Sequence, residues 1–171
     1  MRALSDYKIK FEGLKQGTHN FEFDVDAEFF EEFDCTEFND AAFKVHLEFI
    51  KQSTMMLLNF DFSGYINVPC DRCLDDVEID VDGEEKLIVK FGDELYQETE
   101  EILILPDNAH ELNVAANIYE FLMVNMPQKR VHLEGLCNQK VIKELEKVEQ
   151  KEEDNDIDPR WATLKDIKTE K

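Results

Sequence analysis

The chain has 171 residues and a formal charge of −21 at pH 7, and hydrophobic residues, including 13 Phe, make up 43% of it. This length supports one folded domain with a core and is too short for two ordinary enzyme domains. No apolar run reaches the roughly 18 residues that a membrane span needs. The polar start lacks the apolar core of a signal peptide. We therefore expect a cytoplasmic protein whose cysteines are reduced.

The acidic residues are concentrated in the front part of the chain. Residues 1–126 carry nine Lys and Arg against 29 Asp and Glu, whereas residues 127–171 carry ten against 11. A surface this acidic repels phosphate backbones and attracts basic proteins. Any contact with nucleic acid is therefore expected from the near-neutral C-terminal part.

The first predicted elements are a hairpin and a helical turn. Residues 8–11 and 21–26 should pair around a turn at Gly17, because Phe and Val alternate with acidic residues in the second arm. Residues 27–33 are acidic and aromatic and are expected to form a short helical turn. Cys35 follows this turn, and we expect it to pack as a small apolar residue.

Two longer strands should follow, at residues 43–49 and 55–68. The first alternates Phe, Val and Leu with charged residues, which leaves one face in solvent. The second is apolar enough for a central strand, and Ser63-Gly64 is expected to form a bulge or bend within it. This strand leads directly into Pro69-Cys70, which places the Cys70-Asp71-Arg72-Cys73 segment at a hairpin apex.

The strand that leaves this apex is the most regular pattern in the chain. Apolar residues at 77, 79 and 81 alternate with carboxylates, Asp82-Gly83 is a turn signal, and residues 86–91 predict another strand. The carboxylates have two interpretations: a solvated face that resists aggregation, or a docking surface for a basic partner. The predicted docking face comprises Asp76, Glu78, Asp80 and Asp82.

A short strand at residues 102–105, ended by Pro106, precedes the helical part of the sequence. Apolar residues at three- and four-residue spacings predict a helix near 113–126, with Asn113 as its cap. The predicted fold class is α+β, with a mainly antiparallel sheet or partly closed barrel of hairpins covered by this helix. Residues 1–137 should form the sheet-rich domain, and 138–171 a charged helical tail.

A metal site is suggested by the cysteine spacing. Cys70 and Cys73 can direct both sulfurs at one ion from a tight turn, which supplies half of a tetrahedral site. His132 and Cys137 are the downstream candidates for the other half, and zinc is the metal that suits this ligand set. The alternative is that the cysteines pack as thiols. A redox Cys-x-x-Cys pair is less consistent with strands on both sides.

Taken in order, several motifs resemble the YceD family, the large ribosomal RNA subunit accumulation proteins of bacteria. They are the sequence from Val68 to Asp75, residues 112–127 with Glu120 inside, His132 and Cys137, and Asp158-Pro159-Arg160-Trp161-Ala162-Thr163-Leu164. The resemblance implies a role in synthesis, processing or stability of 23S ribosomal RNA, without established enzymatic activity. Some relatives carry a further cysteine a few residues after the Gly-Leu-Cys, where this chain has Asn138-Gln139-Lys140.

The implied role and the formal charge together suggest a bridging protein. We expect the predicted docking face to engage a basic large-subunit ribosomal protein or assembly factor. A smaller basic set could contact ribosomal RNA: Lys129, Arg130, Lys140, Lys143, Arg160 and Lys165. The alternative function is a zinc-stabilised protein-binding module unrelated to ribosomes. Catalysis is not expected, because no nucleophile–base pattern or glycine-rich phosphate loop occurs.

Overall fold

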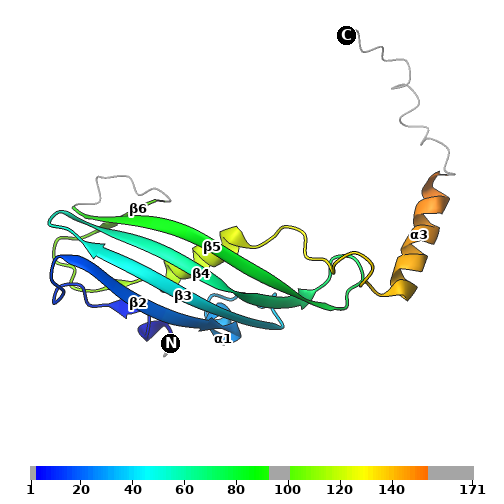
Figure 1. Cartoon of the computed structure of the whole chain (residues 1–171), viewed down its shortest axis with the longest axis horizontal. Coiled ribbons are helices and arrows are strands. Elements are labelled where there is room, and N and C mark those ends of the chain that lie inside the picture. The colour runs from blue at the N-terminus through cyan, green and yellow to red at the C-terminus, as the bar shows by residue number, and fades with distance from the viewer. Residues whose placement is uncertain (1–2, 93–100, 154–171) are drawn as a thin grey trace, which may run out of the picture.

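The computed structural model describes residues 3–92 and 101–153 and contains a long, curved five-stranded sheet (Figure 1). Its strands, in spatial order, are β2 (Gly17–Asp26), β3 (Asp40–Lys51), β4 (Met55–Pro69), β5 (Asp76–Phe91) and β6 (Ile102–Leu105). Neighbours from β2 to β5 pair antiparallel, and β6 pairs parallel with β5. Since β2 and β6 are not paired, the sheet is open, and the predicted partly closed barrel is wrong. The α+β class and the mainly antiparallel sheet are confirmed.

The two faces of the sheet follow directly from residue alternation. In β3 and β4, every second side chain is buried on the inner face, as the two-residue period of a strand requires. Two phenylalanines from α1 (Ala27–Glu31) complete one end of this core, and Asp26 caps that helix by accepting a hydrogen bond from the Phe29 N–H at 3.1 Å. The prediction of a helical turn here is confirmed. The outer face carries polar and charged side chains.

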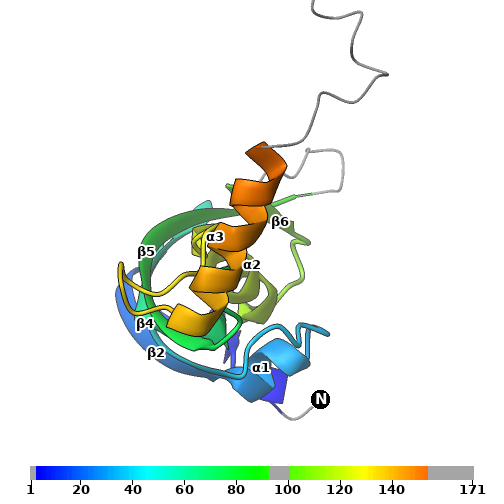
Figure 2. The same ribbon diagram turned by 90° about the vertical axis from the view of Figure 1, so that its right-hand side faces the viewer.

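The inner face is covered by α2 (Ala115–Asn125), which lies inside the curve of the sheet (Figure 2). Ala115, Ile118 and Leu122 are buried against the strands, and the Phe121 ring meets the Phe60 ring edge-on at 5.1 Å between centroids. The helix near 113–126 and its covering role are thus confirmed. The N-cap of this helix is Val114, one residue after the predicted cap, and the Asn113 Oδ1 accepts a hydrogen bond from the Ala115 N–H at 3.0 Å.

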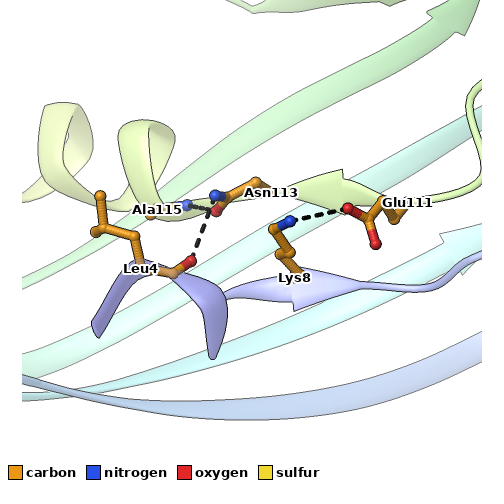
Figure 3. Close-up of polar contacts among 5 residues, drawn as sticks. All are labelled: Leu4, Lys8, Glu111, Asn113 and Ala115. Atoms are coloured by element: carbon orange, nitrogen blue, oxygen red, sulfur yellow. Dashed lines mark hydrogen bonds and ion pairs between the residues drawn. The ribbon is translucent and has the colours of Figure 1, made fainter. Parts of the chain in front are cut away.

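The N-terminal segment does not form the predicted hairpin with residues 21–26. After a short helical turn, η1 (Ala3–Ser5), strand β1 (Lys8–Ile9) pairs with β7 (Leu112–Asn113), while β2 pairs with β3. Figure 3 shows the polar contacts around the β1–β7 pair: the Lys8 ammonium binds the Glu111 carboxylate at 2.9 Å, and the Asn113 amide donates to the Leu4 carbonyl at 3.4 Å. This pairing buries Ile9 and Leu112, which explains why it is preferred over the predicted hairpin.

Two predicted breaks in the strands are also wrong, because glycine has a packing role at each. β5 continues through Asp82-Gly83, and a Cβ on Gly83 would lie 2.7 Å from the Phe62 ring and 2.8 Å from Asn125 Oδ1. β4 continues through Ser63-Gly64 without a bulge, and a Cβ on Gly64 would lie 2.1 Å from the Ala42 carbonyl oxygen. Glycine therefore permits close approach at both positions rather than a turn.

The last described element, α3 (Gln139–Glu153), projects from one end of the sheet (Figure 1). The same end carries the β4–β5 connection and the loop between α2 and α3. α3 confirms the helical character of the predicted C-terminal tail as far as Glu153, and the proposed boundary at residue 138 stays a prediction. None of the described helices is both long and apolar enough to cross a membrane.

Candidate metal centre and the charged surfaces around it

The connection between β4 and β5 is a tight turn that presents two sulfurs. The Cys70 N–H donates to the Asp75 carbonyl, and the Leu74 N–H donates to the Cys70 carbonyl, both at 2.9 Å. These bonds close the loop around Cys70 and Cys73, whose side chains are buried. Leu74 adopts a φ of +63°, a left-handed conformation unusual for a leucine, and its side chain is 76% exposed.

A second loop, between α2 and α3, packs against this turn. Asp71 joins the two through its N–H, which donates to the Arg130 carbonyl at 2.8 Å, and its carboxylate, which accepts from the Arg130 N–H at 2.7 Å. Further along the loop, Gly135 takes a φ of +84°. Asn138 completes the contact: its amide donates to the Asp75 carboxylate at 3.1 Å, and its Oδ1 accepts from the Lys140 N–H at the start of α3.

The two loops bring together all four predicted metal ligands. One ligand atom from each of Cys70, Cys73, His132 and Cys137 lies within 4.8 Å of every other. Cys70 Sγ is 4.0 Å from Cys137 Sγ, Cys73 Sγ is 3.4 Å from His132 Nδ1, and Cys137 Sγ is 4.0 Å from His132 Nδ1. Cys35 is buried near α1 and does not belong to this group.

The orientation of His132 is fixed by a hydrogen bond outside the ligand group. His132 Nε2 lies 3.1 Å from the Asp76 carbonyl oxygen. Because a carbonyl only accepts hydrogen bonds, Nε2 must carry the proton, and the neutral ring then presents Nδ1 as a lone-pair donor. Metal-binding histidines are commonly oriented in this way by a backbone carbonyl. The first residue of β5 thus helps to aim the fourth ligand.

The Cys70 and Cys137 thiols differ in acidity. Burial alone would raise the pKa of Cys70, but hydrogen bonds from the backbone N–H groups of Arg72 and Cys73, with His132 contributing, lower this pKa to about 6. The Arg72 N–H lies 3.4 Å from Cys70 Sγ. Burial and the neighbouring Cys70 and Cys73 sulfurs raise the pKa of Cys137 instead. A lowered thiol pKa favours metal binding, because metal cations bind thiolates and not thiols.

This donor set fits zinc. Zinc–sulfur bonds of about 2.3 Å in a tetrahedron put sulfurs roughly 3.8 Å apart, close to the separations between these ligand atoms. Three thiolates and one imidazole form a closed structural site, which leaves no position for a substrate or a catalytic water. A bound zinc ion would cross-link the β4–β5 turn to the loop that leads into α3.

The predicted docking face lies on the outer side of β5. All four of its carboxylates are exposed and alternate with Val77, Ile79 and Val81, of which the two valines are buried. Asp76 also accepts a hydrogen bond from the Asn39 amide at 2.9 Å. The row is therefore confirmed as one continuous surface, whereas its role in docking stays a prediction.

Pairing of the strands extends this acidic surface beyond the residues that the sequence singled out. Across the sheet, Asp24 lies in one row with Lys44, Ser63 and Asp82, and Asp26 lies in the next row with Ala42, Tyr65 and Asp80. An open hollow of about 580 Å³ lies between the Asp24 and Asp26 carboxylates of β2 and the Asp80 and Asp82 carboxylates of β5. The alternating acidic residues of 21–26 were the available sequence signal, but only the sheet order shows that they share a face of the sheet with β5.

The predicted RNA-contact residues have different environments. Lys129, Lys140 and Lys143 are exposed near the candidate metal centre. We call this end of the sheet, with the β4–β5 turn, the loop of residues 126–138 and the start of α3, the metal-centre end. Arg130 is partly buried: its guanidinium binds the Glu37 carboxylate at 3.0 Å and lies 5.9 Å from the centre of the Phe38 ring. Arg160 and Lys165 lie outside the described residues. Across residues 127–148 there are five basic and three acidic side chains, so the local charge is opposite to that of the sheet.

Comparison with known proteins supports the resemblance seen in the motifs. A family model described as large ribosomal RNA subunit accumulation protein YceD matches residues 58–168. The chain belongs to the YceD family. The match runs from β4 through the candidate metal centre and α3, and leaves out the first 57 residues. No curated protein and no solved structure matches the chain.

Proposed function

We propose that this YceD-family protein is a non-enzymatic ribosome-biogenesis factor that supports synthesis, processing or stability of 23S ribosomal RNA. It acts as a bridge: the docking face on β5 engages a basic large-subunit ribosomal protein or assembly factor, and basic residues at the metal-centre end contact RNA. The family membership supplies the link to large-subunit RNA.

The separation of charge is the observation that carries the bridging proposal. The docking face presents four exposed carboxylates in one row, and Asp24 and Asp26 extend it across the sheet. Such a surface would be repelled by an RNA backbone and favours a basic protein. Lys129, Lys140 and Lys143 stand at the end of the molecule where the acidic excess stops, so phosphate contact is proposed there.

Zinc at the candidate metal centre is proposed as a structural part of this bridge. Held by Cys70, Cys73, His132 and Cys137, it would fix the loop that carries Lys129 against the sheet that carries the docking face. The contacts of Asp71 with Arg130 and of Asn138 with Asp75 support the same arrangement. The ion supplies rigidity and no reaction step in this proposal.

The decisive experiment is recovery of the tagged protein from cells, followed by analysis of the co-purified RNA and proteins. We expect precursors of the large subunit and their 23S RNA. Recovery of the protein without ribosomal material would contradict the proposal and favour the alternative, a zinc-stabilised binding module unrelated to ribosomes. That alternative is kept because the ligand geometry stands without any ribosomal partner.

Charge reversal separates the two halves of the bridge. Glu78→Lys with Asp80→Lys should greatly reduce particle recovery. The matched control is Glu31→Lys with Asp107→Lys, which makes the same charge change at exposed positions outside the docking face. Equal loss in both variants would mean that net charge, and not the docking face, is responsible.

The RNA contact is tested on purified protein. Filter binding of 23S RNA fragments should weaken steeply between low and moderate salt, because each phosphate contact releases counterions. Lys140→Gln with Lys143→Gln should make this salt dependence shallower. An unchanged slope would remove RNA contact from the proposal and leave protein docking alone.

A further inference from the structure

The four candidate ligands divide into two pairs, and each pair has an arrangement that needs no metal. Cys73 Sγ lies 3.4 Å from His132 Nδ1. Because His132 Nε2 is bonded to the Asp76 carbonyl, Nδ1 presents a lone pair, and the Cys73 thiol can donate a hydrogen bond to it. The other pair consists of two sulfurs, Cys70 Sγ and Cys137 Sγ, at 4.0 Å. Two sulfurs can be joined covalently.

A bond between Cys70 and Cys137 would join the same two segments that a zinc ion joins. Cys70 belongs to the β4–β5 turn, and Cys137 to the loop that leads into α3. The Asp71–Arg130 hydrogen bonds, at 2.8 and 2.7 Å, already hold turn and loop together without a metal. Bond formation therefore requires the two sulfurs to approach by roughly 2 Å, while the segments that carry them stay in place.

A bond between Cys70 and Cys73 would not have this effect. The turn that contains both is closed by its own hydrogen bonds, from the Leu74 N–H to the Cys70 carbonyl at 2.9 Å and from the Arg72 N–H to Cys70 Sγ at 3.4 Å. A disulfide within the turn would leave the downstream loop without a cross-link. It would also take Cys73 away from His132.

We propose that the candidate metal centre is a redox switch: a peroxide oxidises Cys137 and Cys70 to a disulfide, and the zinc ion is released while the loop stays attached to the sheet. The Cys73–His132 hydrogen bond satisfies the two remaining ligands. This inference rests on the zinc of the proposed function and adds regulation to it. It requires no ribosomal partner.

The reaction balances with one peroxide molecule for each disulfide. Cys137 is the most exposed of the three sulfur ligands, at 6% against 2% for Cys73 and 0% for Cys70. Its thiolate attacks one peroxide oxygen, the O–O bond breaks, and a sulfenic acid and hydroxide form. The Cys70 thiolate then attacks Cys137 Sγ, the S–S bond forms, and a second hydroxide leaves. Two protons from solvent convert both hydroxides to water, and a third restores the Cys73 thiol.

Purified full-length protein, loaded with zinc and treated with hydrogen peroxide in equimolar steps, tests the switch. We expect loss of the bound zinc, measured with a chromophoric chelator. The thiols titrated after unfolding should fall from four to two. A dithiol reductant with added zinc should restore both values. Oxidised protein should melt at a higher temperature than reduced, metal-free protein, because the disulfide keeps the cross-link.

Peptide mapping identifies which sulfurs are joined. Trypsin cleaves after Arg72, so Cys70 and Cys73 fall in different peptides, and cleavage after Arg130 and Lys140 isolates Cys137. Under non-reducing conditions we expect the Cys70 peptide linked to the Cys137 peptide. A link between Cys70 and Cys73, a link between two copies of the chain, or oxidation to sulfinic acid without a disulfide would overturn the proposal.

Two variants that each lack one ligand separate the pair from the metal. Cys73→Ser keeps Cys70 and Cys137, so peroxide should still lower its thiols, from three to one. Cys70→Ser breaks the pair and should lose thiols far more slowly under the same treatment. Equal rates in the two variants would overturn the assignment. Cys35→Ala is the control and should release zinc as the wild type does.

The outcomes also separate this inference from the proposed function. Zinc that is bound but stays in place under peroxide would overturn the switch and leave the structural zinc intact. A protein that takes up no zinc would overturn both the proposed zinc and its release. Wild-type peptide mapping decides the sulfur pairing even where a serine variant does not fold.

Discussion

The sheet body and the metal-centre end of this protein are stabilised in different ways. Around the sheet and α2, 28 hydrophobic side chains besides the ligand cysteines are buried in one core, and no charged or polar residue among those described is buried with them. At one end of the sheet, the loop from residue 127 to 138 contains no strand and no helix. It meets the β4–β5 turn at the four candidate ligands, whose three cysteines are buried next to the core, and through a few hydrogen bonds. Burial of apolar area stabilises the first region, and coordination of an ion would stabilise the second.

This difference predicts that each region can be disturbed with limited effect on the other. It also agrees with the division of charge, since residues 1–126 carry 29 acidic against nine basic side chains, whereas residues 127–148 carry three against five. Three experiments test the comparison.

The largest effect is expected from Cys73→Ser. Structural zinc sites have apparent binding free energies of about 10–16 kcal/mol, and removal of one of four ligands should abolish stoichiometric zinc. Metal analysis and thermal melting measure this. The matched control is Cys35→Ala, which removes another buried thiol and should keep the zinc. The β-sheet signal in circular dichroism should persist in Cys73→Ser, and its complete loss would show that the two regions are not independent.

A smaller effect, restricted to the sheet body, is expected from Gly64→Ala. The added methyl group would meet the Ala42 carbonyl oxygen at 2.1 Å, so β3 and β4 must separate. Overpacking of this kind costs about 1–3 kcal/mol in free energy of unfolding, measured by urea denaturation. Zinc content should not change.

Gly13→Ala is the control for this variant, because a Cβ there meets no atom within 4 Å. Its free energy of unfolding should stay within about 0.5 kcal/mol of the wild type. If Gly64→Ala released zinc, or if both variants behaved alike, the account of Gly64 as a close-approach site would be wrong.

The smallest effect is expected from Tyr7→Phe. The Tyr7 hydroxyl donates a hydrogen bond to the Asp24 carbonyl at 2.7 Å, and its loss should cost about 0.5–1.5 kcal/mol at neutral pH. Burial, and then the nearby Asp26, Asp24 and Asp6 carboxylates, raise the pKa of Tyr7 from 10.0 to about 12. The folded state therefore favours the protonated phenol.

The sign of the pH dependence follows from this raised pKa. The contribution of Tyr7 is complete below pH 10, the ordinary value, and is lost as the pH rises towards 12. Urea denaturation at several alkaline pH values should therefore show the difference between wild type and Tyr7→Phe shrinking across this interval. A constant difference would mean that the phenol is not perturbed by folding.

Much of the local structure was predictable because it depends on neighbouring residues. Alternation in residues 43–49 and 77–81 predicted strands and their outer faces, and the three- and four-residue spacing near 113–126 predicted the covering helix. The predictions failed at Gly64 and Gly83, because a glycine can either form a turn or allow a close packing contact. Asp82-Gly83 is a good turn sequence, yet the need for space beside Phe62 and Asn125 keeps it inside a strand.

The candidate metal centre shows the same limit at longer range. The Cys70-x-x-Cys73 spacing predicts half of a site, because both residues belong to one turn. Its completion by His132 and Cys137 requires that a loop some 60 residues later be packed against that turn, and the Asp71–Arg130 contacts that do this left no recognisable mark in the sequence. The orientation of His132 by the Asp76 carbonyl is a backbone contact and has no sequence signal at all.

By itself, the sequence determined the strands, the covering helix, the row of carboxylates, the four candidate ligands and, through the order of its motifs, the YceD family. Only the tertiary structure decided that β1 pairs with β7, that Asp24 and Asp26 share a surface with β5, and that the four ligand atoms meet. The physical reason is the range of the forces involved. Periodicity records which side of an element is buried, whereas the choice of partner depends on how distant segments bury their apolar surface together.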